Sequence, residues 1–183
     1  MLAMRRRSGF TMIELMIVLV IAAILMLLAS PEMRSLLQRL RLESAVADMA
    51  GAIDLARTQA IARGSRVQLV PLEPGGSDWR QGWVVFIDTD NNRRPGPGEE
   101  VIASHGPLAQ GIVVTFTFTG NSRPYYIAYN GAGRSCSDTS SLAARMGTLS
   151  FHQDRQIRRI RINMLGRARV CNPDRDAEGC SGD

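Results

Sequence analysis

Lysine is absent from this sequence: all 22 basic residues are arginine, set against 17 acidic residues. A guanidinium group binds phosphate in two-pronged geometry and does not deprotonate, so the positive charge is permanent and suited to anions. Only two histidines occur, which excludes a histidine-rich metal site. No P-loop, HExxH or GxSxG pattern is found, so the enzyme sites built on those motifs are excluded as well. We expect no enzymatic activity and no cofactor.

Extremes of hydrophobicity are missing too. Hydrophobic residues make up 45% of the 183 residues and the mean hydropathy is -0.06, which excludes global disorder and a multi-pass membrane protein. A chain of this length fits one domain with an appendage.

One long apolar run stands at the N-terminus. Residues 10–29 are apolar apart from Thr11 and Glu14. As a helix they would span ~30 Å, which is one bilayer core. The arginines at residues 5–7 precede the run, so the positive-inside rule predicts a cytoplasmic N-terminus and a translocated C-terminus. Glu14 is costly in such a span, and this points to a functional role.

Residues 5–15 resemble the processing site of type IV prepilins and pseudopilins. The resemblance implies that a prepilin peptidase cuts after Gly9, which removes residues 1–9, and methylates the new N-terminus at Phe10. Glu14 then becomes the fifth residue of the mature chain, where its carboxylate neutralises the N-terminal amine of a neighbouring subunit during assembly. The protein would cross the inner membrane once, with a periplasmic head, before it joins a filament of major and minor pilins. An ordinary signal anchor is the alternative.

The remaining sequence predicts an α+β fold with a long N-terminal helix packed on an antiparallel sheet. Apolar residues at spacings of three and four continue the helix to about Arg63, so residues 10–30 form a membrane-spanning or filament-core segment and residues 31–64 an amphipathic continuation. Residues 65–183 switch to period two and form a β-rich head with a C-terminal tail. The predicted strands are residues 66–70, 82–87, 101–104, 112–118, 125–129, 148–152, 157–162 and 168–171.

Three short stretches, at residues 79–88, 90–92 and 98–102, resemble the GspH/FimT subfamily of minor pilins. The resemblance implies a low-abundance, non-catalytic subunit near a filament tip.

Positive charge is concentrated late in the chain. Residues 123–170 carry nine arginines and two acids, a net charge of +7, whereas residues 171–183 carry one arginine and four acids, a net charge of -3. A clustered basic patch is typical of nucleic-acid binding. In a strand, Arg159 and Arg161 would share one face while Ile160 and Ile162 share the other.

The sequence from Gly166 to Arg169 resembles the GRxR DNA-binding motif of FimT-type minor pilins, which serve DNA capture in natural transformation (competence). Arg167 and Arg169 would lie about 7 Å apart in a strand, comparable to successive phosphates. Binding to double-stranded DNA would be sequence-independent and sensitive to salt. Two alternatives stay open: a solvated sheet face in a structural, assembly-priming minor pilin, or a minor pseudopilin of type II secretion whose arginines pair with neighbouring subunits. The expected DNA-binding residues are Arg158, Arg159, Arg161, Gly166, Arg167 and Arg169.

Asp88, Asp90 and Asn92, with Glu99 eleven residues after Asp88, partly match a calcium-binding loop. Arg93 stands where that loop needs glycine, and a Pro-Gly-Pro-Gly run follows. We therefore expect a structural hairpin turn and no metal.

The three cysteines would face the oxidising periplasm, and an odd number predicts one disulfide and one free thiol. A Cys171–Cys180 bond would staple the tail, whereas a Cys136–Cys171 bond would cross the sheet. We favour the staple slightly, because residues 173–183 otherwise have little to hold them.

Overall fold

The computed structural model describes residues 11–120 and 122–180, with no side chains for residues 27–31. It contains two compact units, residues 1–38 and 39–183. The first unit holds the start of helix α1 (Met12–Arg63), and its apolar side chains from Met12 to Met26 are largely exposed. Within the described residues, no helix has an apolar stretch long enough to cross a membrane. Gly9 and Phe10, the predicted processing residues, lie outside the described residues.

A reciprocal cap starts helix α1. The Glu14 backbone N–H donates to the Thr11 hydroxyl at 3.3 Å, and the Thr11 backbone N–H donates to the Glu14 carboxylate at 3.5 Å. This is the capping-box arrangement, which satisfies two donors that a helix N-terminus leaves unpaired. The structure thus gives Glu14 a local role that the sequence analysis did not include.

Helix α1 ends as the sequence predicts. Gly64 takes φ of +62°, a conformation that L side chains rarely adopt. The N–H of Ser65 donates to the carbonyl of Ala60, and the N–H of Gly64 donates to that of Ile61, both at 3.3 Å. These are the two hydrogen bonds of a Schellman motif, and they turn the chain into the first strand.

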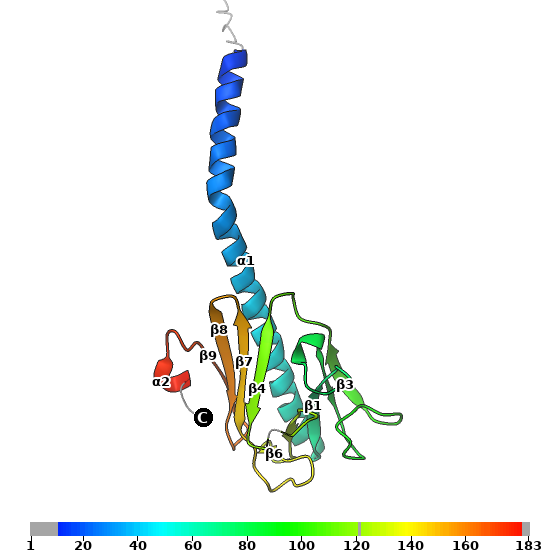
Figure 1. The fold of residues 1–183 in the computed structure, drawn as a ribbon. Coiled ribbons are helices and arrows are strands. Elements are labelled where there is room, and N and C mark those ends of the chain that lie inside the picture. Colours follow the sequence, from blue (N-terminus) through cyan, green and yellow to red (C-terminus); the bar gives the residue numbers. More distant parts are fainter. Residues whose placement is uncertain (1–10, 121, 181–183) are drawn as a thin grey trace, which may run out of the picture. The chain divides into compact units, whose positions relative to one another are not determined.

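Two antiparallel sheets follow, where the sequence predicts one (Figure 1). The first has the order β3-β2-β1-β5-β6 and the second the order β4-β7-β8-β9. Alternation with period two identifies a strand but does not show which other strand pairs with it. The division into two sheets was therefore not predicted. The first sheet comprises β1 (Val67–Pro71), β2 (Trp83–Phe86), β3 (Val101–His105), β5 (Ile127–Tyr129) and β6 (Ser135–Cys136). The second comprises β4 (Val113–Phe118), β7 (Gly147–Gln153), β8 (Gln156–Ile162) and β9 (Ala168–Cys171).

The predicted strands are all present, each within two residues of its predicted bounds. Strand β6 was not predicted, because a strand of two residues shows no measurable alternation. Two short helices complete the structure: η1 (Trp79–Gln81), a 3-10 helix, and α2 (Ala177–Cys180) in the tail.

A single large core lies between helix α1 and the two sheets. It includes Met49 and Ile53 of α1, Trp83 of the first sheet, and Leu149 and Ile160 of the second, each at most 2% exposed. All buried members of this core lie between residues 42 and 162, so the unit that begins at residue 39 contains the whole of it. A smaller apolar cluster around Phe86 fills the other face of the first sheet.

Candidate functional site

The second sheet has one apolar and one polar face, and its register aligns polar residues across all four strands. One row runs Thr117, Thr148, Arg161, Arg169, and the next runs Thr115, Ser150, Arg159, Cys171. Ile160 and Ile162 point the other way, into the core, at 0% and 3% exposed. The predicted alternation of β8 is therefore confirmed, and it places two arginines on a face rich in hydroxyl groups.

This polar face is hollowed into a groove of about 770 Å³. Four of the predicted DNA-binding residues contribute to it, from β8, β9 and the turn between them. Threonine and serine side chains of β4 and β7 line it as well, and the C-terminal tail closes one side. The lining includes Arg159, Arg161, Arg167, Arg169, Thr117, Thr148, Ser150, Gly179 and Cys180.

Two of the arginines that line the groove lie opposite each other on neighbouring strands. Arg161 and Arg169 are direct partners in the β8–β9 register. Cβ atoms of such partners are about 5 Å apart, and like charges at that spacing destabilise a sheet. An arrangement that costs stability and gathers positive charge in a hollow is typical of an anion-binding surface.

The tail supplies acceptors for these arginines. Asp176 accepts a hydrogen bond from Arg169 at 2.7 Å, in an exposed ion pair. The carbonyl oxygens of Gly179 and Cys180 accept from Arg161 at 3.0 Å and from Arg159 at 3.1 Å. Acidic and carbonyl groups of the tail thus occupy positions that an external anion would need.

A disulfide holds the tail at this place. Cys171, the last residue of β9, is bonded to Cys180, the last residue of α2. This is one of the two pairings that the sequence leaves open. Cys136 is a buried free thiol, and burial raises its pKa to about 11, so it is protonated and unreactive at neutral pH.

A tight turn between β8 and β9 presents Arg167. Gly166 has φ of +78°, and a Cβ there would lie 2.3 Å from the carbonyl oxygen of Gly133, so only glycine fits. Asn163 closes the turn, because its side chain accepts from the backbone N–H of Arg167 at 3.0 Å. The Arg167 side chain is exposed, and its guanidinium has no partner among the described residues. Gly166 therefore acts by shaping the turn.

Five of the nine arginines in residues 123–170 do not line the groove, and Arg158 and Arg145 are two of them. Arg158 lies on the opposite face of β8 and contacts Glu43 of α1 at 3.3 Å, because adjacent strand residues point to opposite faces. Arg145 is 6% exposed and donates to the backbone carbonyls of Thr119, Gly120 and Tyr126, and burial lowers its pKa. Arg158 therefore does not share the groove with Arg159 and Arg161.

The groove also contains residues that the sequence analysis missed. Thr117, Thr148 and Ser150 alternate with apolar residues along β4 and β7, and this alternation was the available signal. No signal pointed to Asp176, because its contact with Arg169 depends on the folding back of the tail.

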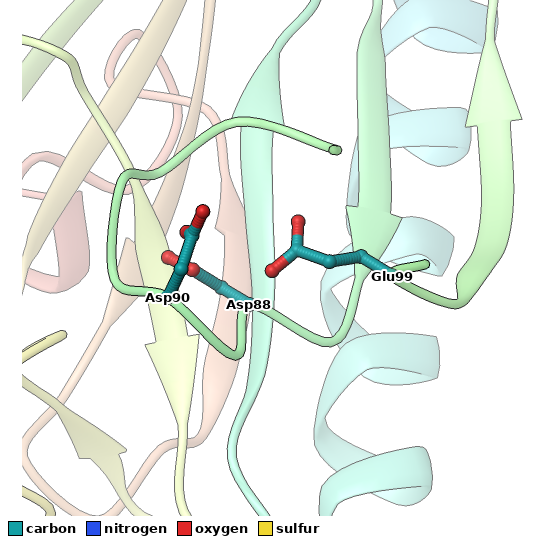
Figure 2. A group of neighbouring side chains, drawn as sticks. All are labelled: Asp88, Asp90 and Glu99. Carbon is teal, nitrogen blue, oxygen red and sulfur yellow. The ribbon is translucent and has the colours of Figure 1, made fainter. Parts of the chain in front are cut away.

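The loop between β2 and β3 contains the other predicted feature. It joins two paired strands, as expected of a hairpin, and it also brings Asp88, Asp90 and Glu99 together (Figure 2). Burial raises the pKa of Asp88, and the nearby Glu99 carboxylate adds to this effect. Burial acts on Glu99 in the same direction, but hydrogen bonds from Thr89 and Gly96 outweigh it and lower the pKa of Glu99.

Comparisons with known proteins agree with this fold. A sequence model of the family described as Type II transport protein GspH matches residues 45–166, and one of the prokaryotic N-terminal methylation motif matches residues 4–30. The pilin-like protein PilA1 of Thermus thermophilus is 37% identical over 99 residues, which are 54% of this chain. The match spans only 60% of that relative's length.

Two solved structures share the fold. The type IV minor pilin FimU of Pseudomonas aeruginosa superposes with a TM-score of 0.55 at 15% identity, over 74% of this chain and 92% of FimU. The minor pseudopilin EpsH of the Vibrio cholerae type 2 secretion system gives 0.51 at 13% identity, over 73% of this chain and 98% of EpsH. The chain belongs to the GspH family, and it is a minor pilin or pseudopilin of a type IV pilus or a type II secretion system.

Proposed function

We propose that this protein is a minor pilin at or near the tip of a type IV pilus, where it binds double-stranded DNA for uptake in natural transformation. The arginine-lined groove on the second sheet is the observation that supports this proposal. Arg159, Arg161, Arg167 and Arg169 supply positive charge, and the hydroxyl groups beside them supply further donors to phosphate.

The groove fits a backbone-binding mode. Arg167 and Arg169 are two residues apart on the same face, about 7 Å in an extended chain, so they can contact successive phosphates. The elements around the groove are strands and the four-residue α2, which is too short to lie along a major groove and read bases. Binding should therefore be independent of sequence and weaken steeply with salt.

Maturation and assembly form the second part of the proposal. Prepilin peptidase would cut after Gly9 and methylate Phe10, and residues 10–30 would anchor the protein in the inner membrane with its head in the periplasm. The exposed apolar side chains from Met12 to Met26 would then be covered by lipid and later by neighbouring pilins. Glu14 would pair with the N-terminal amine of a neighbour.

DNA binding can be measured on residues 39–183, which contain the whole core, with the disulfide intact. Fluorescence anisotropy with double-stranded DNA at a series of salt concentrations would compare the wild type with Arg167→Ala/Arg169→Ala. Loss of two phosphate contacts should weaken binding at least tenfold at low salt. It should also reduce the steepness of the slope of log K against log salt by about two. Arg41→Ala/Arg155→Ala, a pair of exposed arginines outside the groove, is the matched control.

The absence of DNA binding at the groove would favour a structural role in a filament. If the wild type does not bind at low salt, or if both double variants lose affinity equally, the groove is not a DNA site. The same arginines would then serve a subunit interface in a structural minor pilin or in a pseudopilin of type II secretion. EpsH, a minor pseudopilin with this fold, keeps that alternative open.

A further inference from the structure

Three carboxylates of the loop between β2 and β3 face a common space (Figure 2). Asp88, Asp90 and Glu99 each present an oxygen atom, and these atoms lie within 4.8 Å of one another. Like charges at this separation repel, most strongly where protein replaces water. Thr89 and Gly96 donate hydrogen bonds to Glu99, and Asn92 donates to Asp90, which stabilises two of the carboxylates; a cation would relieve the remaining repulsion.

Asp88 provides an independent observation. It is 4% exposed, and its Oδ2 accepts from the Gln68 amide at 2.9 Å and from the backbone N–H of Arg93 at 3.0 Å. Its Oδ1 is shielded from water and has no hydrogen-bond partner among the described residues. A buried charged acceptor without a partner is costly, and such atoms are rare in folded proteins. Asp88 belongs to the carboxylate cluster, and a cation bound there would give this carboxylate the partner that it lacks.

The arginines of the loop do not neutralise the cluster. Arg93 directs its guanidinium to Asp138 at 2.5 Å, and Arg94 directs its own to the carbonyls of Glu73 and Pro74. Arg93 also takes φ of +61°, so it adopts the left-handed turn for which glycine was expected. The presence of Arg93 at the glycine position therefore does not prevent a cation in the structure.

We infer that this loop binds a hard divalent cation, with calcium as the best fit, through Asp88, Asp90 and Glu99. All three ligands are carboxylate oxygens, which suit calcium, magnesium or manganese, and no histidine or cysteine joins them. Calcium accepts irregular oxygen shells completed by backbone carbonyls and water, whereas magnesium demands a near-ideal octahedron. Three protein ligands on a surface loop predict a dissociation constant of about 0.1–1 mM, as in extracellular modules.

Binding would link the two ends of the loop. Asp88 lies two residues after β2 and Glu99 lies two residues before β3, so a shared cation would tie the exit of one strand to the entry of the next. Asp88 also holds the backbone of Arg93, whose side chain reaches Asp138. The cation would therefore stabilise the loop and the polar cluster beside it.

Calorimetry and thermal unfolding can test the site on residues 39–183 after treatment with EDTA. Titration with calcium chloride should give a saturable heat, and about 10 mM calcium should raise the Tm by several degrees. Magnesium chloride at the same concentration should give a smaller shift. No heat and no Tm shift with calcium would overturn the inference, and an equal shift with magnesium would overturn the preference for calcium.

Asp90→Asn is the informative variant, because Asp90 is exposed and asparagine can still accept the hydrogen bond from the Asn92 backbone N–H. It should bind calcium at least tenfold more weakly, yet without calcium it should be at least as stable as the wild type, because one like charge is removed. A variant that binds as well as the wild type would contradict the site. Asp154→Asn, in the exposed turn between β7 and β8, is the control for general charge effects. The groove proposed to bind DNA lies on the other sheet. The outcome of these calcium experiments is therefore independent of the proposed function.

Discussion

At the scale of single residues, Asp138 is the clearest case of a buried charge with matched partners. It is 3% exposed and accepts hydrogen bonds from Arg93 at 2.5 Å, from Tyr126 at 2.9 Å and from Ser137 at 3.0 Å. The Arg145 guanidinium lies 4.1 Å from the centroid of the Tyr126 ring. Burial alone would raise the pKa of Asp138, but the hydrogen bonds from Arg93, Tyr126 and Ser137 outweigh burial and lower it.

The lowered pKa predicts a pH-dependent cost for Asp138→Asn. The contribution of the carboxylate is present above its unfolded pKa of about 4 and is lost as the pH falls through the lower folded pKa. At pH 7 the variant should lose about 3 kcal/mol of unfolding free energy, because Arg93 is left without its anion. Urea unfolding at pH 7 and pH 3 would measure the loss, which should shrink at pH 3. A loss of equal size at both pH values would contradict this, and the exposed Asp54→Asn is the control.

At the scale of elements, strand β8 shows how well the alternation of residues predicts which side chains share a face. Its alternation correctly separates Arg159 and Arg161 from the buried isoleucines, because a strand presents successive side chains to opposite faces. The same rule places Arg158 on the face opposite the groove, although the sequence analysis grouped it with its neighbours by charge. The tail shows no regular alternation of apolar and polar residues, so the sequence did not predict its contacts with the arginines.

The tail should compete with DNA for the arginines. Asp176→Asn removes the carboxylate that pairs with Arg169, so DNA affinity at low salt should rise several-fold. Asp174→Asn removes an equal charge from an exposed position without that contact and should have a smaller effect. Fluorescence anisotropy with both variants would measure this, and reduction of the Cys171–Cys180 bond in the wild type should act in the same direction. Unchanged affinity in Asp176→Asn would show that the tail does not compete.

At the scale of the whole molecule, the proposed assembly into filaments depends on Glu14. The residue has two candidate roles: the local cap with Thr11 and the pairing with a neighbour's N-terminal amine. The two roles make different demands, because the cap needs only an acceptor side chain, which Gln also supplies, whereas the pairing needs a negative charge.

Glu14→Gln should separate these roles. It keeps the cap but loses the charge, so its incorporation into filaments should fall severely, as it should for Glu14→Ala. Thr11→Ala weakens the cap by about 1 kcal/mol and keeps the charge, so incorporation should persist. Immunoblots of sheared filaments from cells that express each full-length variant would measure the outcome. Normal incorporation of Glu14→Gln would refute the charge-pairing role.

The sequence by itself determined the long helix, its end at Gly64, the positions of all strands but β6, and the sides on which Arg159 and Arg161 lie. Each of these depends on neighbours a few residues apart, whose spacing is written directly in the chain. Only the tertiary structure decided that the strands form two sheets, that Asp176 meets Arg169, and that Asp88, Asp90 and Glu99 converge. These contacts depend on strand pairing and on the return path of loops and tail, which local periodicity does not encode.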